Sequence, residues 1–163
     1  MKHSLLVLWM GLCISGPVMA EVQVAFTPGQ AQTLVLETLN RAQSQIDLVA
    51  YSFTSEPVVR ALLAAQQRGV QVRVVVNAKT AEEKHGKAAY LASQGVAVRL
   101  NGRYSIQHNK FAVIDHQTVQ TGSANYTASA FTRNAENVVV MDNEPVVASA
   151  YQQEFERLWY EAF

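Results

Sequence analysis

His108-Asn109-Lys110-Phe111-Ala112-Val113-Ile114-Asp115, followed after six intervening residues by Gly122-Ser123-Ala124-Asn125, is the most informative stretch of this 163-residue chain. Apolar runs lie on both sides of the turn-forming sequence Asp115-His116-Gln117. They predict two strands, Ile106–Ile114 and Thr118–Thr121, that are joined by a tight turn. The stretch therefore predicts an antiparallel hairpin.

Polar side chains gather at one end of this predicted hairpin. His108 and Lys110 are two residues apart, so on a strand their side chains point to the same side. Ser123 and Asn125 are also two residues apart and follow the return strand. We therefore expect these four side chains at one end of the sheet.

Apolar runs alternate with helical patterns on the N-terminal side of the hairpin. An order of strand, helix, strand, helix and strand is typical of a parallel sheet with helices on both faces, to which the hairpin adds an antiparallel part. The sequence thus predicts an α/β fold with a mixed, largely parallel sheet and helices on both faces, in one domain that covers residues 21–163. The other predicted strands are Val22–Phe26, Ile46–Phe53, Val70–Val76, Val96–Leu100 and Asn137–Met141.

Four helices are predicted between and after these strands. Thr27 is placed to cap the first, with Pro28 at its first position and Gln30 completing a capping box. The polar stretch Ala124–Ala135 is predicted to be a loop with one helical turn. The remaining helices are expected to begin at Ser55 and end near Gly69, to span Ala81–Gln94, and to begin at Pro145.

The first twenty residues predict a secretory signal peptide. Lys2 and His3 precede the apolar stretch Ser4–Ile14, and Ala20 is a small residue at the expected cleavage site. An uncleaved anchor is the alternative, although the apolar stretch is short for a membrane span. Cys13 is the only cysteine, so cleavage after Ala20 leaves a chain without thiols. We expect a bacterial periplasmic or secreted protein that has no stable membrane association once the signal is removed.

Composition and charge narrow the class of protein. Hydrophobic residues make up 49% of the chain and charged residues 16%, which excludes a disordered or fibrous chain. The formal net charge is zero, but residues 60–110 carry +7, whereas residues 21–59 carry −3 and residues 111–163 carry −5. A basic middle third is typical of a protein with an anionic partner, although solvated helix faces would give the same count.

The polar cluster suggests phosphate chemistry. A histidine can act as a nucleophile or as an acid and base near neutral pH, and a lysine supplies a fixed positive charge. Serine and asparagine add neutral hydrogen bonds to the same anion. Each of these residues alone is more commonly structural, so the hypothesis depends on their combination.

The combination H-x-K-x4-D-x6-G-S-x-N, formed by His108, Lys110, Asp115, Gly122-Ser123 and Asn125, resembles the signature of the phospholipase D superfamily. Glu136 before an apolar strand and Tyr51-Ser52-Phe53-Thr54 are similar to other parts of that family. Typical members carry two copies of the motif. A single copy in a short secreted chain is similar to the small bacterial endonucleases found on conjugative plasmids.

The resemblance implies a homodimer, because the family's active site needs two motifs that face each other. One His108 would attack phosphorus and form a phosphohistidine, and the partner's His108 would protonate the leaving oxygen and then activate water. Lys110 would neutralise the phosphate, Ser123 and Asn125 would hydrogen-bond its oxygens, and Glu136 would orient a histidine. Asp115 belongs to the motif, but we expect it to hold the hairpin. No metal or cofactor is required by this scheme.

The substrate is predicted less directly. Nucleases and lipid hydrolases of the family would share these residues, and the basic middle third favours nucleic acid, with DNA before RNA. The sequence thus predicts a metal-independent, sequence-nonspecific endonuclease, with a cardiolipin-type phospholipase and a non-catalytic nucleic-acid-binding module as alternatives. Candidate contacts to the nucleic-acid backbone are Lys79, Lys84, Lys87, Arg99, Arg103 and Arg133.

Overall fold

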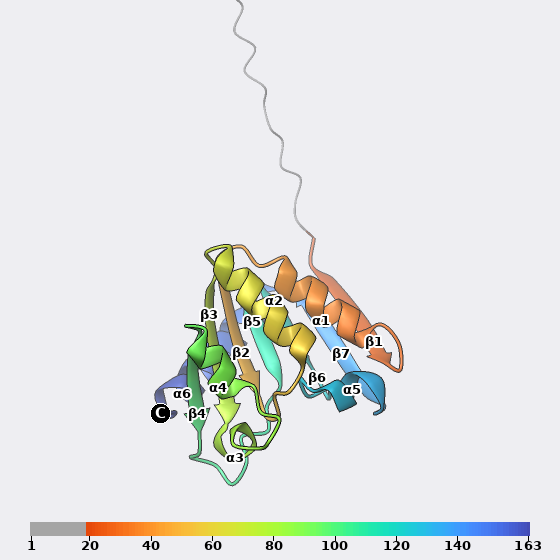
Figure 1. Cartoon of the computed structure of the whole chain (residues 1–163). Coiled ribbons are helices and arrows are strands. Elements are labelled where there is room, and N and C mark those ends of the chain that lie inside the picture. The colour runs from red at the N-terminus through yellow and green to blue at the C-terminus, as the bar shows by residue number, and fades with distance from the viewer. Residues whose placement is uncertain (1–18) are drawn as a thin grey trace, which may run out of the picture.

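A computed structural model describes residues 19–163, and most of the predicted signal peptide lies outside these residues. Seven strands form one sheet in the order β1-β7-β6-β5-β2-β3-β4 (Figure 1). The strands are β1 (Glu21–Thr27), β2 (Gln45–Ala50), β3 (Gln71–Asn77), β4 (Ala97–Asn101), β5 (Phe111–Ile114), β6 (Thr118–Gly122) and β7 (Glu136–Asp142).

Helices cover both faces of the sheet, as predicted. In Figure 1, α1 and α2 lie in front of the sheet and α6 lies behind it. The larger core cluster fills the space between the sheet and α1 and α2, and a smaller cluster lies under α6. The helices are α1 (Ala31–Asn40), α2 (Glu56–Gln67), α3 (Ala78–Ala81), α4 (Ala88–Ser93), α5 (Ala128–Thr132) and α6 (Pro145–Tyr160).

The mixed α/β fold is confirmed, but the sheet is not largely parallel. Only the β2–β3 and β3–β4 pairs are parallel, and the other four pairs are antiparallel. The β5–β6 hairpin pairs with β2 through β5, and β7 continues the antiparallel part. The first strand, β1, is the outermost strand on one side of the sheet and pairs with β7.

Two helix predictions were wrong. Thr27 does not cap α1, which begins at Ala31. Instead, its hydroxyl donates to the Asn134 carbonyl at 2.8 Å and accepts from the Glu136 N–H at 2.9 Å. The predicted helix 81–94 forms only over α4, because residues 82–87 between α3 and α4 are not helical. A Cβ on Gly86 would lie 2.4 Å from the Ala81 carbonyl oxygen, so the chain turns where only glycine fits.

Candidate active site

Strand direction brings the predicted site residues to one edge of the sheet. The C-terminal ends of β2 and β6 lie at the same edge as the N-terminal ends of β5 and β7, because each neighbouring pair among these strands is antiparallel. His108 and Lys110 immediately precede β5, Ser123 and Asn125 follow β6, and Glu136 begins β7. The structure therefore places all five residues at this end of the central strands, which we call the site edge.

The segment that carries His108 is a loop and not the predicted strand. β5 begins at Phe111, and residues 102–110 have no regular structure. Gln107 is buried and fixes this loop. Its N–H donates to Asn77 Oδ1 at 2.9 Å, and its side-chain amide donates to the Ala50 carbonyl at 3.1 Å. Gln107 Oε1 also accepts from the Asn109 N–H at 2.7 Å, so the chain on both sides of His108 is held.

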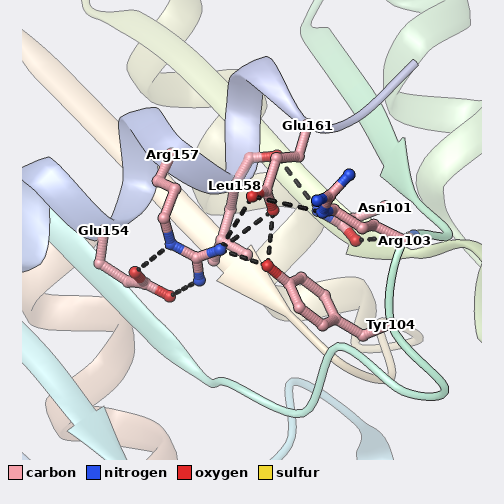
Figure 2. Close-up of polar contacts among 7 residues, drawn as sticks. All are labelled: Asn101, Arg103, Tyr104, Glu154, Arg157, Leu158 and Glu161. Carbon is pink, nitrogen blue, oxygen red and sulfur yellow. Dashed lines mark hydrogen bonds and ion pairs between the residues drawn. The ribbon is translucent and has the colours of Figure 1, made fainter.

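The start of the same loop is tied to the end of α6, as Figure 2 shows. The Tyr104 hydroxyl donates to Glu161 Oε2 at 2.7 Å and accepts from Arg157. Arg157 also pairs with Glu154 at 2.6 Å and with Glu161 at 3.0 Å. Arg103 adds a longer ion pair of 3.5 Å to Glu161. This network anchors one end of the loop, and Gln107 anchors the other.

His108 and Lys110 share contacts with Tyr51. The His108 ring meets the Tyr51 ring edge to face at a centroid distance of 4.6 Å. Lys110 Nζ lies 5.5 Å from the Tyr51 centroid and donates to the His108 carbonyl at 2.7 Å. His108 is exposed, whereas Lys110 is only 8% exposed. Burial lowers the pKa of Lys110, and the nearby Glu136 carboxylate partly opposes this shift. A bound phosphate would favour the charged form of this buried ammonium and would oppose the effect of burial.

The β6–β7 side of the site is built on Ser123 and Glu136. The Ser123 hydroxyl donates to Glu136 Oε2 at 2.5 Å and accepts from the Asn137 N–H at 3.0 Å. Asn134 donates to Glu136 Oε1 at 3.0 Å. Gly122 permits this approach. It has a φ of +146°, and a Cβ there would lie 2.2 Å from the Asn137 carbonyl oxygen.

Two expected contacts take a different form. Within residues 19–163, Glu136 is bonded to Ser123 and Asn134 and not to the His108 ring. The Asn125 Oδ1 atom is buried without a hydrogen-bond partner in the part of the chain that is described. A phosphate oxygen cannot donate to Oδ1, so rotation of the amide that exchanges Oδ1 and Nδ2 would present a donor to a phosphate at this position.

Asp115 lies at the opposite end of the strands, directly after β5. Its carboxylate accepts from the N–H groups of Gln43, Ser44 and Gln45 at 2.8–2.9 Å and from the Ser44 hydroxyl at 2.8 Å. Its backbone has a φ of +51°. The structure thus places this motif residue where it holds the turn and the start of β2, and not among the other site residues.

The predicted nucleic-acid contacts are divided. Lys79, Lys84, Lys87, Arg103 and Arg133 lie in segments that adjoin the site edge, whereas Arg99 lies within β4. The Arg99 guanidinium stacks 4.5 Å from the Trp159 ring centroid and donates to the Trp159 carbonyl at 2.9 Å. Lys87 is paired with Glu56. Arg99 is therefore a packing residue, and Lys87 and Arg103 have carboxylate partners in Glu56 and Glu161.

Sequence reasoning missed the residues that support the site. Asn77 and Gln107 fix the loop before β5, and Asn134 and Asn137 bind the Glu136–Ser123 pair. Of the residues around the site, Tyr51 belongs to the family resemblance. A polar residue next to a motif position, such as Gln107 beside His108, is the sequence feature that could indicate such a supporting residue.

Two further observations concern metals and membranes. Across residues 19–163, no group of three or more His, Cys, Asp or Glu side chains is placed to hold a metal ion. In the same part of the chain, no helix has the length and apolar character that a membrane span requires.

Comparisons with known proteins find similar sequences and similar structures. The sequence profile of the family described as cardiolipin synthase, PLD-like domain, matches residues 35–159. The mitochondrial cardiolipin hydrolase of Xenopus tropicalis is 41% identical over 127 residues, which are 78% of this chain and 60% of that protein. Phospholipase D of Rickettsia prowazekii is 33% identical over 139 residues, which are 85% of this chain and 68% of that protein.

A solved structure is also similar. The phospholipase D family member Nuc from Salmonella typhimurium superposes with a TM-score of 0.87 at 36% identity, covering 89% of this chain and 97% of that one. NucT from Helicobacter pylori, at 20% identity and a TM-score of 0.81, shares the fold. The chain thus spans nearly the whole of Nuc but about 60% of the length of the cardiolipin hydrolases it matches.

Proposed function

The chain belongs to the phospholipase D-like family, and we propose that it is a metal-independent, sequence-nonspecific endonuclease that cleaves phosphodiester bonds of nucleic acid, preferably DNA. The observation that supports this proposal is the convergence of His108, Lys110, Ser123 and Glu136 on one sheet edge. Lys79, Lys84 and Arg133 border that edge, and a basic border of this kind suits an extended polyanion better than a single headgroup.

The reaction proceeds by double displacement in a homodimer. His108 of one protomer attacks phosphorus through a ring nitrogen, and the bond to the leaving oxygen breaks. The partner's His108 gives its proton to that oxygen, and then takes a proton from the water that hydrolyses the phosphohistidine. Lys110 of both protomers stabilises the charge on the phosphoryl oxygens. Asn125 donates to the same oxygens, and Glu136 stabilises the charged form of a histidine.

Digestion of plasmid DNA in excess EDTA tests the proposal. The wild-type chain is compared with His108→Asn and with the matched control His116→Asn, which lies at the turn beyond β5. Asparagine tolerates the positive φ of 58° at His116, so the control keeps its backbone. We expect cleavage by the wild type and the control, and none by His108→Asn. Equal cleavage by all three proteins would contradict the mechanism, and no cleavage by the folded wild type would contradict the nuclease assignment.

A phospholipid phosphodiesterase is the second candidate, because relatives at 41% and 33% identity are named mitochondrial cardiolipin hydrolase and phospholipase D. The same three proteins are incubated with cardiolipin vesicles and with RNA. Release of phosphatidic acid that depends on His108, without DNA or RNA cleavage, would replace the nuclease proposal. We also propose export to the bacterial periplasm or medium, with a mature N-terminus at Glu21. N-terminal sequencing of the protein from the secreting cell tests this.

A further inference from the structure

The Tyr51 side chain contacts both motif residues at the site edge. Tyr51 follows directly after β2 and is half-buried. Its ring meets the His108 ring edge to face at a centroid distance of 4.6 Å, and Lys110 Nζ lies 5.5 Å from its centroid. The proposed double displacement gives Tyr51 no task, although its ring touches both of the groups that would act on the phosphate.

Two hydrogen bonds fix the chain at Tyr51. The Tyr51 carbonyl accepts from the hydroxyl of Thr80, a buried residue of α3. The preceding carbonyl, that of Ala50, accepts from the Gln107 side chain at 3.1 Å. Gln107 is directly before His108 in the chain, so this bond also ties the end of β2 to the loop that carries His108. The two rings therefore meet between backbone segments that are held together.

The contact with Tyr51 restricts the His108 imidazole. His108 is exposed, and within residues 19–163 its ring has no hydrogen-bond partner, since Glu136 is bonded to Ser123 and Asn134 instead. An exposed side chain without such a contact exchanges among several rotamers, and a nucleophile must be presented to phosphorus in one of them. Edge-to-face packing favours one ring orientation, because the positive edge of one ring meets the negative face of the other.

The same ring stabilises the Lys110 ammonium. Lys110 is only 8% exposed, and across residues 19–163 its Nζ forms no ion pair. Nζ donates to the His108 carbonyl at 2.7 Å and lies near the Tyr51 ring, whose negative face attracts a cation. Burial lowers the pKa of Lys110, and the Glu136 carboxylate on β7 opposes this shift only in part. The Tyr51 ring acts in the same direction as Glu136.

We propose that Tyr51 is a positioning residue whose ring holds the His108 imidazole and the Lys110 ammonium in place before a phosphate binds. This inference rests on the proposed function, in which both groups act on a phosphodiester. The ring carries the role and the hydroxyl does not, because both contacts are made by the ring and the hydroxyl has no hydrogen-bond partner in the part of the chain that is described. One side chain thus orients the nucleophile and the positive charge that stabilises the transition state.

Three variants of the chain that begins at Glu21 test the inference. Tyr51→Leu removes the ring, and Tyr51→Phe removes only the hydroxyl. Tyr160→Leu is the matched control, because Tyr160 is 78% exposed at the end of α6. Hydrolysis of bis(p-nitrophenyl) phosphate, a small phosphodiester, gives kcat and KM without a nucleic acid or a lipid surface. We expect kcat of Tyr51→Leu to fall by about 10-fold, with a smaller change in KM, and wild-type values for the other two variants.

The pH dependence of kcat separates the effect on Lys110 from a general loss of activity. Without the Tyr51 ring, Lys110 loses a group that favours its charged form, so it should release its proton at a lower pH than in the wild type. The ratio of wild-type kcat to Tyr51→Leu kcat should therefore grow between about pH 7 and about pH 9. Titration of His108 and Glu136, the other groups beside Lys110, affects both proteins alike.

NMR of the imidazole C–H protons reports on His108 without any substrate. The chain from Glu21 onward has three histidines, His85, His108 and His116, and His108→Asn identifies the signal of His108. A neighbouring aromatic ring shifts such signals. In Tyr51→Leu the His108 signal should move toward that of an exposed histidine, and in Tyr51→Phe it should stay close to the wild-type position. The signals of the other two histidines should not move.

A folded Tyr51→Leu with wild-type kinetics and an unchanged His108 signal would overturn the inference. Equal losses in Tyr51→Leu and Tyr51→Phe would also overturn it, and would assign the role to the hydroxyl. A wild-type chain whose His108 signal depends on the Tyr51 ring, but that hydrolyses no phosphodiester, would support the placement and contradict only the proposed function. Thermal unfolding shows whether each variant folds, and Tyr51→Met is read in the same way if Tyr51→Leu does not.

Discussion

Replacing Asp115 by Asn separates the structural part of the motif from the catalytic part. The Asp115 carboxylate accepts three backbone N–H groups, from Gln43, Ser44 and Gln45, and the hydroxyl of Ser44. It lies at the end of β5 that is far from His108. Asparagine tolerates the φ of +51° at this position, so the substitution changes the charge and the hydrogen-bond acceptors without straining the backbone.

The expected cost follows from these four bonds. Hydrogen bonds to a charged group contribute about 1.5–3 kcal/mol each when they are buried, and less where water can replace the partner. Asp115 is partly exposed, and asparagine keeps one acceptor oxygen, so we expect a loss of about 2 kcal/mol in the free energy of unfolding. At about 3 °C per kcal/mol for a domain of this size, Tm should fall by about 6 °C.

The pH dependence gives a second test. Partial burial raises the pKa of Asp115, but the three N–H groups and the Ser44 hydroxyl outweigh it and hold the pKa below its ordinary value. The stabilisation is therefore complete above the unfolded-state value of about 3.9, and is lost as the pH falls through the folded-state pKa. Urea unfolding of both proteins should show a constant difference from pH 5 to 8 and a smaller one below about pH 4.

Activity per folded molecule should be unchanged in Asp115→Asn at 25 °C, since no site residue contacts Asp115 in residues 19–163. The reciprocal control is Glu136→Gln, which alters the other motif carboxylate. The reasoning would be refuted if Asp115→Asn kept its Tm and lost cleavage.

Four further substitutions test the remaining parts of the site. Glu136→Gln should lower kcat by about 100-fold or more, because the neutral amide no longer stabilises a charged histidine. Its free energy of unfolding should stay within about 0.5 kcal/mol of the wild-type value. A large loss of stability would instead make Glu136 structural. Tyr104→Phe removes the hydroxyl between Arg157 and Glu161. It should cost about 1 kcal/mol of stability and lower kcat severalfold with little change in KM. Unchanged kinetics would show that the α6 network does not position the loop. Arg99→Ala should lower stability by about 1 kcal/mol and leave DNA affinity unchanged. Arg133→Ala should instead weaken DNA binding and reduce the slope of log affinity against log salt by about 1. Titrations at several salt concentrations distinguish the two variants, and the reverse result would contradict the placement of both residues.

The hairpin and the site edge could be predicted from the sequence because both follow from local rules. Turn residues between two apolar runs specify a hairpin, and strand direction then decides which side chains share an edge. The position of β1 could not be predicted in this way. Its place beside β7 depends on pairing between residues more than 100 positions apart, as with Val24 and Val139, and the alternation of strands and helices says nothing of it.

The loop before β5 shows a second limit. Ile106 and its neighbours have the composition of a strand, but Gln107 is held by Asn77 and Ala50, which precede it by 30 and 57 residues. Charge counts fail for a similar reason. Arg73 contributes to the basic middle third, yet it is paired with Asp47 at 2.7 Å and with Glu156 at 2.6 Å. Net charge per segment cannot distinguish such internal pairs from cations that are available to a ligand.

The Ser123 hydroxyl cannot donate to Glu136 and to a phosphate at the same time. A serine hydroxyl has a single hydrogen, and in this structure it goes to Glu136, while the oxygen accepts from the Asn137 N–H. Ser123 can therefore donate to a phosphate only after its hydrogen bond to Glu136 breaks. A histidine that becomes charged beside Glu136 would supply the replacement donor, because both ring nitrogens then carry hydrogens. In the proposed mechanism, a move of the Ser123 hydrogen bond from Glu136 to the phosphate would leave Glu136 Oε2 open to a charged histidine, so both steps would involve this one carboxylate.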